Sequence, residues 1–383
     1  MDRIALTERP GWKAKAEELG FRFHTMHGEP YWDETSAYRF TLDEVETRIE
    51  GPGTELHAMC REAVAAIVAS EELMERLAIP PGHRDLVAES WRRAEPELYG
   101  RMDLSYTPGA PAKLLEYNAD TPTALYESAA FQWLWLEDMI AAGALPAGAD
   151  QFNGVHEALV ARMKGMFAPA TDVHFTSIPG SEEDYATVEY MAWCAREAGL
   201  GAHYVPLDAI GITPTGQFAD GESRVIGALF KLYPWEDMLR DDFAGYIPGS
   251  GCRIMEPAWK ALVSNKGLLP VLWRLFPGHP NLLPAVFEGE APPDGPLVSK
   301  PLFSREGASV VMQTPEGEVA SERRDYDAWP RILQAYAPLP EFDGWHPVIG
   351  AWIVGEDCVG MGIREDRSRI TQDLSRFKPH VLT

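Results

Sequence analysis

Apolar residues recur at intervals of three and four along the N-terminal third of the chain, which is the spacing of amphipathic helices. The pattern predicts helices over residues 6–20, 43–49, 54–79, 87–95 and 123–142. Between the last two helices, residues 97–120 change to two extended segments around Thr107-Pro108-Gly109-Ala110-Pro111, where proline and glycine supply a turn. The N-terminal part is therefore predicted to be helical with one β-hairpin.

A strand, a helix and a second strand are predicted in succession within residues 172–207. Ser181 and the three acidic residues after it form a helix-capping pattern, and Gly199 provides the stop before the second strand. This succession indicates a βαβ unit with parallel strands. Residues 224–233 are predicted to add a further strand, so we expect an α/β domain here.

Beyond residue 256 the pattern changes to short strands after a single helix. The helix is predicted at 266–276, and the strands at 297–301, 308–313, 348–354 and 358–363. Turn sequences such as Pro315-Glu316-Gly317-Glu318 favour an antiparallel sheet. We therefore predict a mixed α/β protein in three parts: helices and hairpin at 1–160, a Rossmann-like α/β unit at 161–255, and an antiparallel part at 256–383 against which the first part packs.

Composition and charge narrow the classes of function. The 383 residues include 34 Lys and Arg against 58 Asp and Glu, a net charge of −24. This balance argues against nucleic-acid and anionic-membrane partners, which need clustered basic residues, and weakly favours cationic substrates. No apolar run reaches the ~18–20 residues of a membrane span, and no signal-peptide pattern begins the chain. Because the four cysteines are far apart and form no CxxC pair, we expect free thiols and a cytoplasmic protein.

The predicted hairpin brings together residues suited to a metal ion. A turn centred between Gly109 and Ala110 would place Asp103 opposite Glu116 and Arg101 opposite Asn118, because the two residues of each pair are equally far along the chain from that turn. Opposed residues on one face have Cβ atoms about 4.5–5.5 Å apart. Two carboxylates and an amide carbonyl are hard oxygen ligands that suit Mg²⁺. The alternative is a solvated hairpin face with ordinary ion pairs.

Three basic positions lie in settings that suit phosphate binding. Lys300 ends a predicted strand before a loop of small residues, Lys266 stands at a predicted helix start where a lysine is electrostatically unfavourable, and Arg364 lies in a strand followed by acids. The alternatives are a solvated strand-end lysine, an exposed first-turn lysine and a strand-edge salt bridge, respectively. Neither GxxxxGK[ST] nor GxGxxG occurs. Four histidines show no metal-ligand spacing, and we expect them to be structural or surface residues: His174, His203, His279 and His346.

These segments, in this order, resemble the synthetase part of the glutathionylspermidine synthase family, which is of the ATP-grasp type. The resemblance is carried by Arg101-Met-Asp103, Leu115-Glu-Tyr-Asn-Ala-Asp-Thr-Pro-Thr123, Ser264-Asn-Lys266, Val298-Ser-Lys-Pro301, Pro347-Val-Ile-Gly-Ala-Trp352 and Gly362-Ile-Arg-Glu-Asp366. It spans nearly the whole chain and is closest to shorter members without an amidase domain. It implies an ATP-grasp-like antiparallel sheet domain with an inserted Rossmann-like pre-ATP-grasp domain.

The resemblance also implies residue roles. Magnesium ligands would be Asp103, Glu116 and Asn118, and the catalytic arginines would be Arg101 and Arg364. ATP would be bound by Lys266, Lys300, Arg305 and Gly307, with Gln334 and Tyr336 assigned to the adenine on position alone. The peptide substrate would lie near Thr121 and Thr123, and the amine near Glu182 and Glu183.

The implied activity is ATP- and Mg²⁺-dependent amide ligation of a peptide or amino-acid carboxylate to an amine or polyamine, through an acyl phosphate. A second hypothesis is a non-catalytic nucleotide- or polyamine-binding protein on the same scaffold, and a third is a structural protein that does not use ATP. The tail departs from the family pattern, because it has Asp373 and Arg376 where the family has a late lysine and an acid that contacts polyamine. The identity of the acid and the amine and the oligomeric state are therefore left open.

Overall fold

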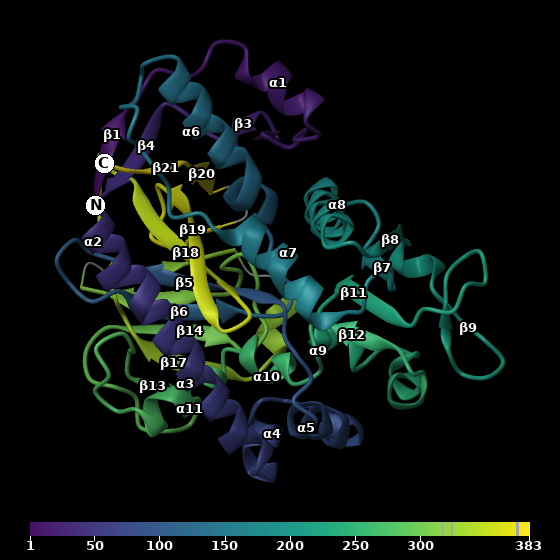
Figure 1. Cartoon of the computed structure of the whole chain (residues 1–383). Coiled ribbons are helices and arrows are strands. Elements are labelled where there is room, and N and C mark those ends of the chain that lie inside the picture. Colours follow the sequence, from purple (N-terminus) through teal and green to yellow (C-terminus); the bar gives the residue numbers. More distant parts are fainter. Residues whose placement is uncertain (316, 323–324, 373–374) are drawn as a thin grey trace.

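The computed structural model describes residues 1–383 apart from 316, 323–324 and 373–374. Within the described residues, two five-stranded antiparallel sheets form the centre of the molecule (Figure 1). In order across the first sheet, the strands are β20 (Arg376–Lys378), β19 (Asp357–Asp366), β18 (His346–Val354), β5 (Tyr99–Ser105) and β6 (Lys113–Asn118). Across the second they are β13 (Ala285–Phe287), β17 (Arg331–Ala335), β14 (Leu297–Pro301), β15 (Val311–Thr314) and β16 (Gly317–Ala320).

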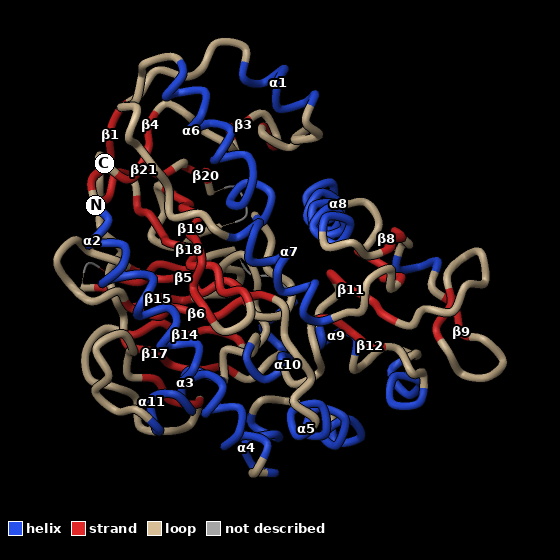
Figure 2. Tube along the Cα trace, in the orientation of Figure 1, coloured by secondary structure: helices blue, strands red, loops and turns tan. Residues whose placement is uncertain are grey.

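A parallel sheet stands to one side of these two, on the right in Figure 2. Its strands, in order, are β12 (Arg253–Met255), β11 (Ala228–Leu232), β7 (Asp172–Ser177) and β8 (Gly201–Tyr204). The helix α8 (Glu182–Glu197) connects β7 to β8, and the Ser181 hydroxyl accepts a hydrogen bond from the Asp184 amide at 3.1 Å. The predicted βαβ unit, its cap and its additional strand are confirmed.

Helices cover the antiparallel sheets. The long helix α3 (Gly51–Val68) packs against β18 and β19, and α11 (Leu268–Leu275) packs against α3 and β13. The other helices are α1 (Trp12–Glu18), α2 (Leu42–Val45), α4 (Glu71–Arg76), α5 (Arg84–Arg92), α6 (Gln132–Ala141), α7 (Val155–Met166), α9 (Trp235–Met238) and α10 (Lys260–Val263). A small sheet joins the two ends of the chain through β1 (Asp2–Ala5), β4 (Ser36–Phe40) and β21 (His380–Leu382). There are also two short hairpins. One pairs β2 (Thr25–Met26) with β3 (Glu29–Pro30), and the other pairs β9 (Gly211–Ile212) with β10 (Phe218–Ala219).

The hairpin β5–β6 has the predicted register. Arg101 pairs with Asn118 and Asp103 with Glu116, and the register shifts only after Asp103. The next strand, β18, approaches β5 closely at Gly350, where an added Cβ would lie 2.7 Å from the Arg101 Cδ. Glycine at this position leaves the space in which the Arg101 side chain crosses its neighbouring strand.

Several predicted boundaries were wrong for local reasons. The helix predicted over 54–79 is broken at Ser70, whose hydroxyl accepts from the Leu73 amide and begins α4. The helix predicted over 6–20 begins only at Trp12, because β1 pairs with β4. The predicted turn at 315–318 includes Glu316, which lies outside the described residues. The three-part division at 160 and 255 remains a prediction, although the parallel strands fall within 172–255.

Candidate active site

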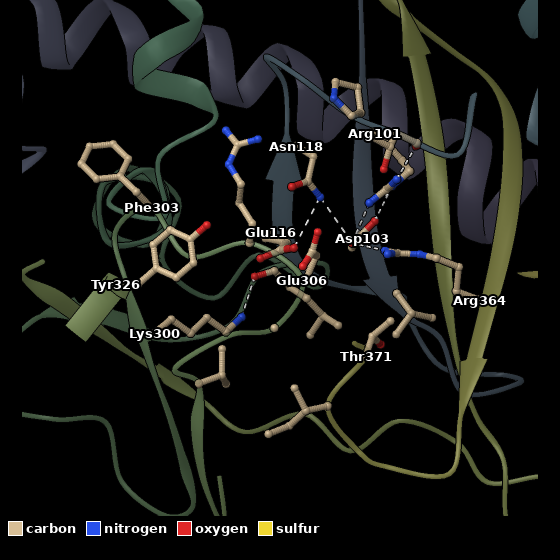
Figure 3. A pocket seen from close by; sticks show the side chains of 18 of the residues that line it. Arg101, Asp103, Glu116, Asn118, Lys300, Phe303, Glu306, Tyr326, Arg364 and Thr371 are labelled. Atoms are coloured by element: carbon tan, nitrogen blue, oxygen red, sulfur yellow. Dashed lines mark hydrogen bonds and ion pairs between the residues drawn. The ribbon is translucent and has the colours of Figure 1, made fainter. Parts of the chain in front are cut away.

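A cavity of about 440 Å³ lies where the hairpin β5–β6, the strands β14 and β17, the loop after β14 and the segment that begins α9 meet (Figure 3). Eleven of the predicted site residues line it: Arg101, Asp103, Glu116, Asn118, Thr121, Thr123, Lys300, Arg305, Gly307, Gln334 and Arg364. These residues come from both antiparallel sheets and from loops far apart in sequence. The fold therefore gathers most of the predicted site into one place.

Asp103 is the centre of a buried charge network. Its carboxylate accepts hydrogen bonds from the Arg101 Nε at 2.8 Å and from the Arg364 Nη2 at 2.6 Å. Burial acts to lower the pKa of Arg101, but the charge and hydrogen bonds of Asp103 outweigh it and raise that pKa above its usual value. Arg101 and Asp103 are only 6% and 5% exposed, so this part of the hairpin face is buried, and the ion pairs of the alternative interpretation are present within it. Asp103 thus holds both arginines at the cavity wall.

Glu116 lies beside this network with its own cation. Its Oε2 is 3.1 Å from the Lys266 Nζ. Burial acts to raise the pKa of the Glu116 carboxyl, but the charges of Lys266, Lys300 and Arg364 prevail and lower it to about 2. Lys266 itself is buried and also donates to the Ser304 carbonyl, so the exposed-lysine alternative is wrong.

Lys300 is held by backbone and amide groups. Its Nζ donates to the Leu115 carbonyl at 2.9 Å and to the Gln334 Oε1 at 2.8 Å, and its side chain is buried. Burial lowers the pKa of this ammonium group to about 8, because the nearby charge of Glu116 offsets only part of the cost. Among the described residues no carboxylate forms an ion pair with Lys300, and such a buried ammonium group is well suited to receive an anion.

The loop after β14 closes over the cavity. It has left-handed backbone at Glu306, Gly307 and Ser309, and an added Cβ at Gly307 would lie 2.4 Å from the Thr371 carbonyl oxygen. Arg305 donates to the Thr121 hydroxyl at 2.8 Å. The loop thus spans the cavity from β14 to the C-terminal segment, as Figure 3 shows for Glu306 and Thr371.

The three residues predicted to bind magnesium lie close together and have side chains whose chemistry would fit that ion. The Asn118 Nδ2 lies 3.3 Å from the Asp103 Oδ2 and 3.4 Å from the Glu116 Oε1, so the three polar heads meet at one point. A flip of the Asn118 side-chain amide would exchange its nitrogen and oxygen and place the oxygen beside the two carboxylates. Among the described residues no group of three His, Cys, Asp or Glu is positioned for a metal; the predicted trio has two acids and an amide.

Four predicted residues do not line the cavity. Lys266 contacts it through Glu116. Glu182 lines a second cavity of about 800 Å³. Glu183 lies near Tyr31, whose pKa is raised by burial, by the charge of Glu127 and by the charge of Glu183. Tyr336 packs against the apolar cluster of Val298, Val310 and Ile370. Gln334 lines the cavity, but its amide also donates to the Leu114 carbonyl, and the cavity continues along Ala335, Ala337 and Leu339.

Sequence reasoning missed further lining residues on irregular segments. They include Asp184, Glu236, Phe303, Glu306, Tyr326, Arg369 and Thr371. Two of them lie in segments that the sequence pattern had already marked: Asp184 in the helix-capping pattern and Glu306 in the predicted loop after the strand at 297–301. Glu236 follows the predicted strand at 224–233, where parallel strands commonly carry functional residues at their carboxyl ends.

Two antiparallel sheets around a basic pocket that contains paired carboxylates are the architecture expected of an ATP-grasp-type ligase. The fold is similar to that of a glutathione synthetase-like effector from Globodera pallida, with a TM-score of 0.55, 10% identity and coverage of 91% of this chain and 89% of that one. The model of the family described as glutathionylspermidine synthase preATP-grasp matches residues 3–383. The chain belongs to the glutathionylspermidine synthase family.

Three relatives show how far the similarity extends. A Haemophilus influenzae protein named "Putative acid--amine ligase" is 38% identical, with coverage of 97% of both chains. The trypanothione synthetase of Crithidia fasciculata is 29% identical, with coverage of 94% of this chain and 58% of the relative. The bifunctional glutathionylspermidine synthetase/amidase of Escherichia coli is 25% identical, with coverage of 97% and 63%. The chain thus matches only part of the two longer relatives.

Two further expectations concern the whole chain. The four cysteines are free, with Cys60, Cys194 and Cys358 buried and Cys252 half-buried. In the part of the chain that the structure describes, no helix has both the length and the apolar character to cross a membrane.

Proposed function

We propose that this protein uses MgATP to activate a peptide or amino-acid carboxylate as an acyl phosphate and then joins it to an amine. The observation that carries the proposal is a charge network at one cavity: Asp103 holds Arg101 and Arg364 in the cavity wall, and Glu116, also in the wall, pairs with Lys266. Phosphoryl transfer to a carboxylate accumulates negative charge, and preorganised cations stabilise it. The family and its ligase relatives support the same class of reaction.

ATP would lie with its phosphates toward the basic wall. Lys300 offers an ammonium group without a carboxylate partner in the described residues, and Lys266 would act on this wall through Glu116, with which it pairs. The cavity wall along Ala335, Ala337 and Leu339 would receive the adenine. Because the Gln334 side chain is occupied by Lys300 and the Leu114 carbonyl, its proposed part is to fix Lys300.

Asp103, Glu116 and Asn118 would hold magnesium, which would neutralise charge on the transferring phosphoryl group. Arg101 and Arg364 are already oriented by Asp103 toward the cavity, so they need no rearrangement to face the developing acyl phosphate. The loop with Arg305 and Gly307 would exclude water from that intermediate.

The carboxylate substrate would lie along Thr121 and Thr123, and the amine would enter from the second cavity. Ile178 lines both cavities, which places them next to one another. The second cavity is lined by the carboxylates of Glu182 and Glu189 and by aromatic rings: Phe23, Tyr126, Tyr185, Tyr190, Trp193 and Tyr204. Carboxylates and aromatic faces both attract cations, which fits an ammonium compound and leaves spermidine as one candidate among several amines.

All the charged residues predicted for the ligase reaction are present, which gives no support to the alternative of a non-catalytic binding protein. The four free thiols also fit the reducing cytoplasm, where we propose the protein acts on small molecules.

An ADP-release assay over pools of carboxylates and amines tests the proposal. We expect ADP formation that requires one acid, one amine and Mg²⁺, and calorimetric binding of MgATP. Glu116→Ala should reduce this turnover at least ~100-fold because it removes a group that positions the metal. If no acid and amine pair releases ADP and MgATP does not bind, the ligase proposal is wrong.

A further inference from the structure

The loop arginine Arg305 is held by two groups on the opposite side of the cavity. Its Nη2 is 2.8 Å from the Glu236 Oε1, and its Nη1 donates to the Thr121 hydroxyl at 2.8 Å. The Glu236 side chain is 12% exposed and the Arg305 side chain 35% exposed. The contact therefore joins the loop after β14 to α9, which directly follows the parallel-sheet strand β11.

Both partners of Arg305 are fixed by one buried residue, Asp120. Its Oδ1 lies 2.5 Å from the Lys231 Nζ, and its Oδ2 accepts from the Trp235 amide at 2.7 Å. The Asp120 and Lys231 side chains are 0% and 1% exposed. Thr121 follows Asp120 and Glu236 follows Trp235 along the chain. The two acceptors of Arg305 are thus set in place by the same rigid anchor.

A second contact joins the same two segments. The Arg240 guanidinium lies 5.8 Å from the ring centre of Phe303, which is on the loop, and 4.6 Å from that of Trp329. Arg240 also donates to the Glu236 backbone carbonyl at 2.5 Å. The closed loop is therefore bound by an ion pair and a stacked cation that both depend on the residues around α9.

We infer that Glu236 is a positioning residue that holds Arg305 and keeps the loop closed over the acyl phosphate. The inference rests on the proposed ligase function. In the productive step the amine nitrogen forms a bond to the acyl carbon, phosphate leaves and the amine loses a proton. When the loop opens, water adds to the same carbon, phosphate leaves and the free carboxylate is regenerated. Weak closure therefore consumes ATP without forming amide.

The ratio of ADP released to amide formed measures this role. Glu236→Gln keeps the size of the side chain and removes its charge, and we expect this ratio to rise roughly three- to ten-fold. The matched control is Asp242→Asn, because Asp242 carries an equal charge on the exposed segment after α9, does not line the cavity and forms no ion pair in the described part of the chain. The control should keep the wild-type ratio. A wild-type ratio in Glu236→Gln, or an equal rise in both variants, would overturn the inference.

Hydrogen exchange tests the contact separately from the chemistry. The Ala308 amide donates to the Arg305 carbonyl at 2.8 Å. The Val310 amide donates to the Gly307 carbonyl at 3.4 Å and to the Ser321 hydroxyl at 2.9 Å, so it ties the loop to the segment after β16. Without substrates, we expect both to exchange roughly three- to ten-fold faster in Glu236→Gln than in wild type or Asp242→Asn, because opening becomes more frequent. Unchanged exchange would refute the contact even in an active ligase. Faster exchange in a protein that releases no ADP would instead refute the proposed function and leave the loop contact established.

Discussion

Asp103 holds two arginines in a buried part of the cavity wall, which makes Asp103→Asn the most informative substitution. The asparagine keeps the shape but removes the charge that Arg101 and Arg364 share. Hydrogen bonds to charged groups contribute about 1.5–3 kcal/mol each, and removing one partner of a buried pair costs about 3–5 kcal/mol. Because the Arg364 side chain is 19% exposed and can gain water, we expect the lower end, a loss of about 3 kcal/mol in the free energy of unfolding.

Urea unfolding and the ADP-release assay measure the two consequences. Turnover should fall at least ~100-fold, because the arginines lose their orientation and the proposed magnesium site loses a ligand. Added inorganic phosphate should stabilise the variant more than wild type, since an anion can replace the missing charge. The control is Glu89→Gln, whose carboxylate pairs with Arg92 at 2.6 Å on an exposed surface and should cost less than about 1 kcal/mol. The reasoning fails if Asp103→Asn costs no more than this control and retains turnover.

Two further changes examine the cavity wall. The pKa of Lys300, about 8, lies below its unfolded value, so its charge destabilises the native state below pH 8 and stability should rise as the pH increases above 8. kcat/KM for MgATP should fall over the same pH range, because the Lys300 ammonium group loses its proton, whereas kcat/KM of Lys300→Arg should not change with pH in this range. If kcat/KM of both proteins falls in parallel, this prediction is wrong. Gly350→Ala would place a Cβ 2.7 Å from the Arg101 Cδ, so turnover should drop at least ~10-fold, with a loss of about 1–3 kcal/mol in unfolding free energy; full turnover would show that Arg101 can shift without penalty.

Local rules predicted the parts of the site in which spacing fixes geometry. The hairpin register followed from the positions of the turn residues, because alternation in a strand leaves few pairings that place Arg101 and Asp103 on one face. The cap at Ser181 and the parallel strands followed in the same way. The roles assigned to these residues came from the resemblance and remain proposals.

Other features depend on contacts between distant segments, which a local pattern does not contain. Ser70 interrupts a helical pattern because its own cap competes with continuation of the helix. The Glu236 contact with Arg305 joins residues 69 positions apart. Gln334 was assigned to adenine by position, whereas its side chain packs between Lys300 and the Leu114 carbonyl. Each of these could be found only after the sheets had been placed.

The order of strands in the first antiparallel sheet bears on how the protein is made in the cell. Its hairpin β5–β6 is synthesised early, but its neighbour β18 begins at His346, near the end of the chain. A ribosome must therefore produce most of the protein before Arg101 and Asp103 gain the strand that supports them. Pairings this distant form slowly and leave an apolar strand edge exposed in the meantime. Nascent chains should consequently be unable to retain MgATP until the last forty or so residues have emerged. Until then, chaperones should bind mainly to the hairpin β5–β6, whose edge has no partner strand.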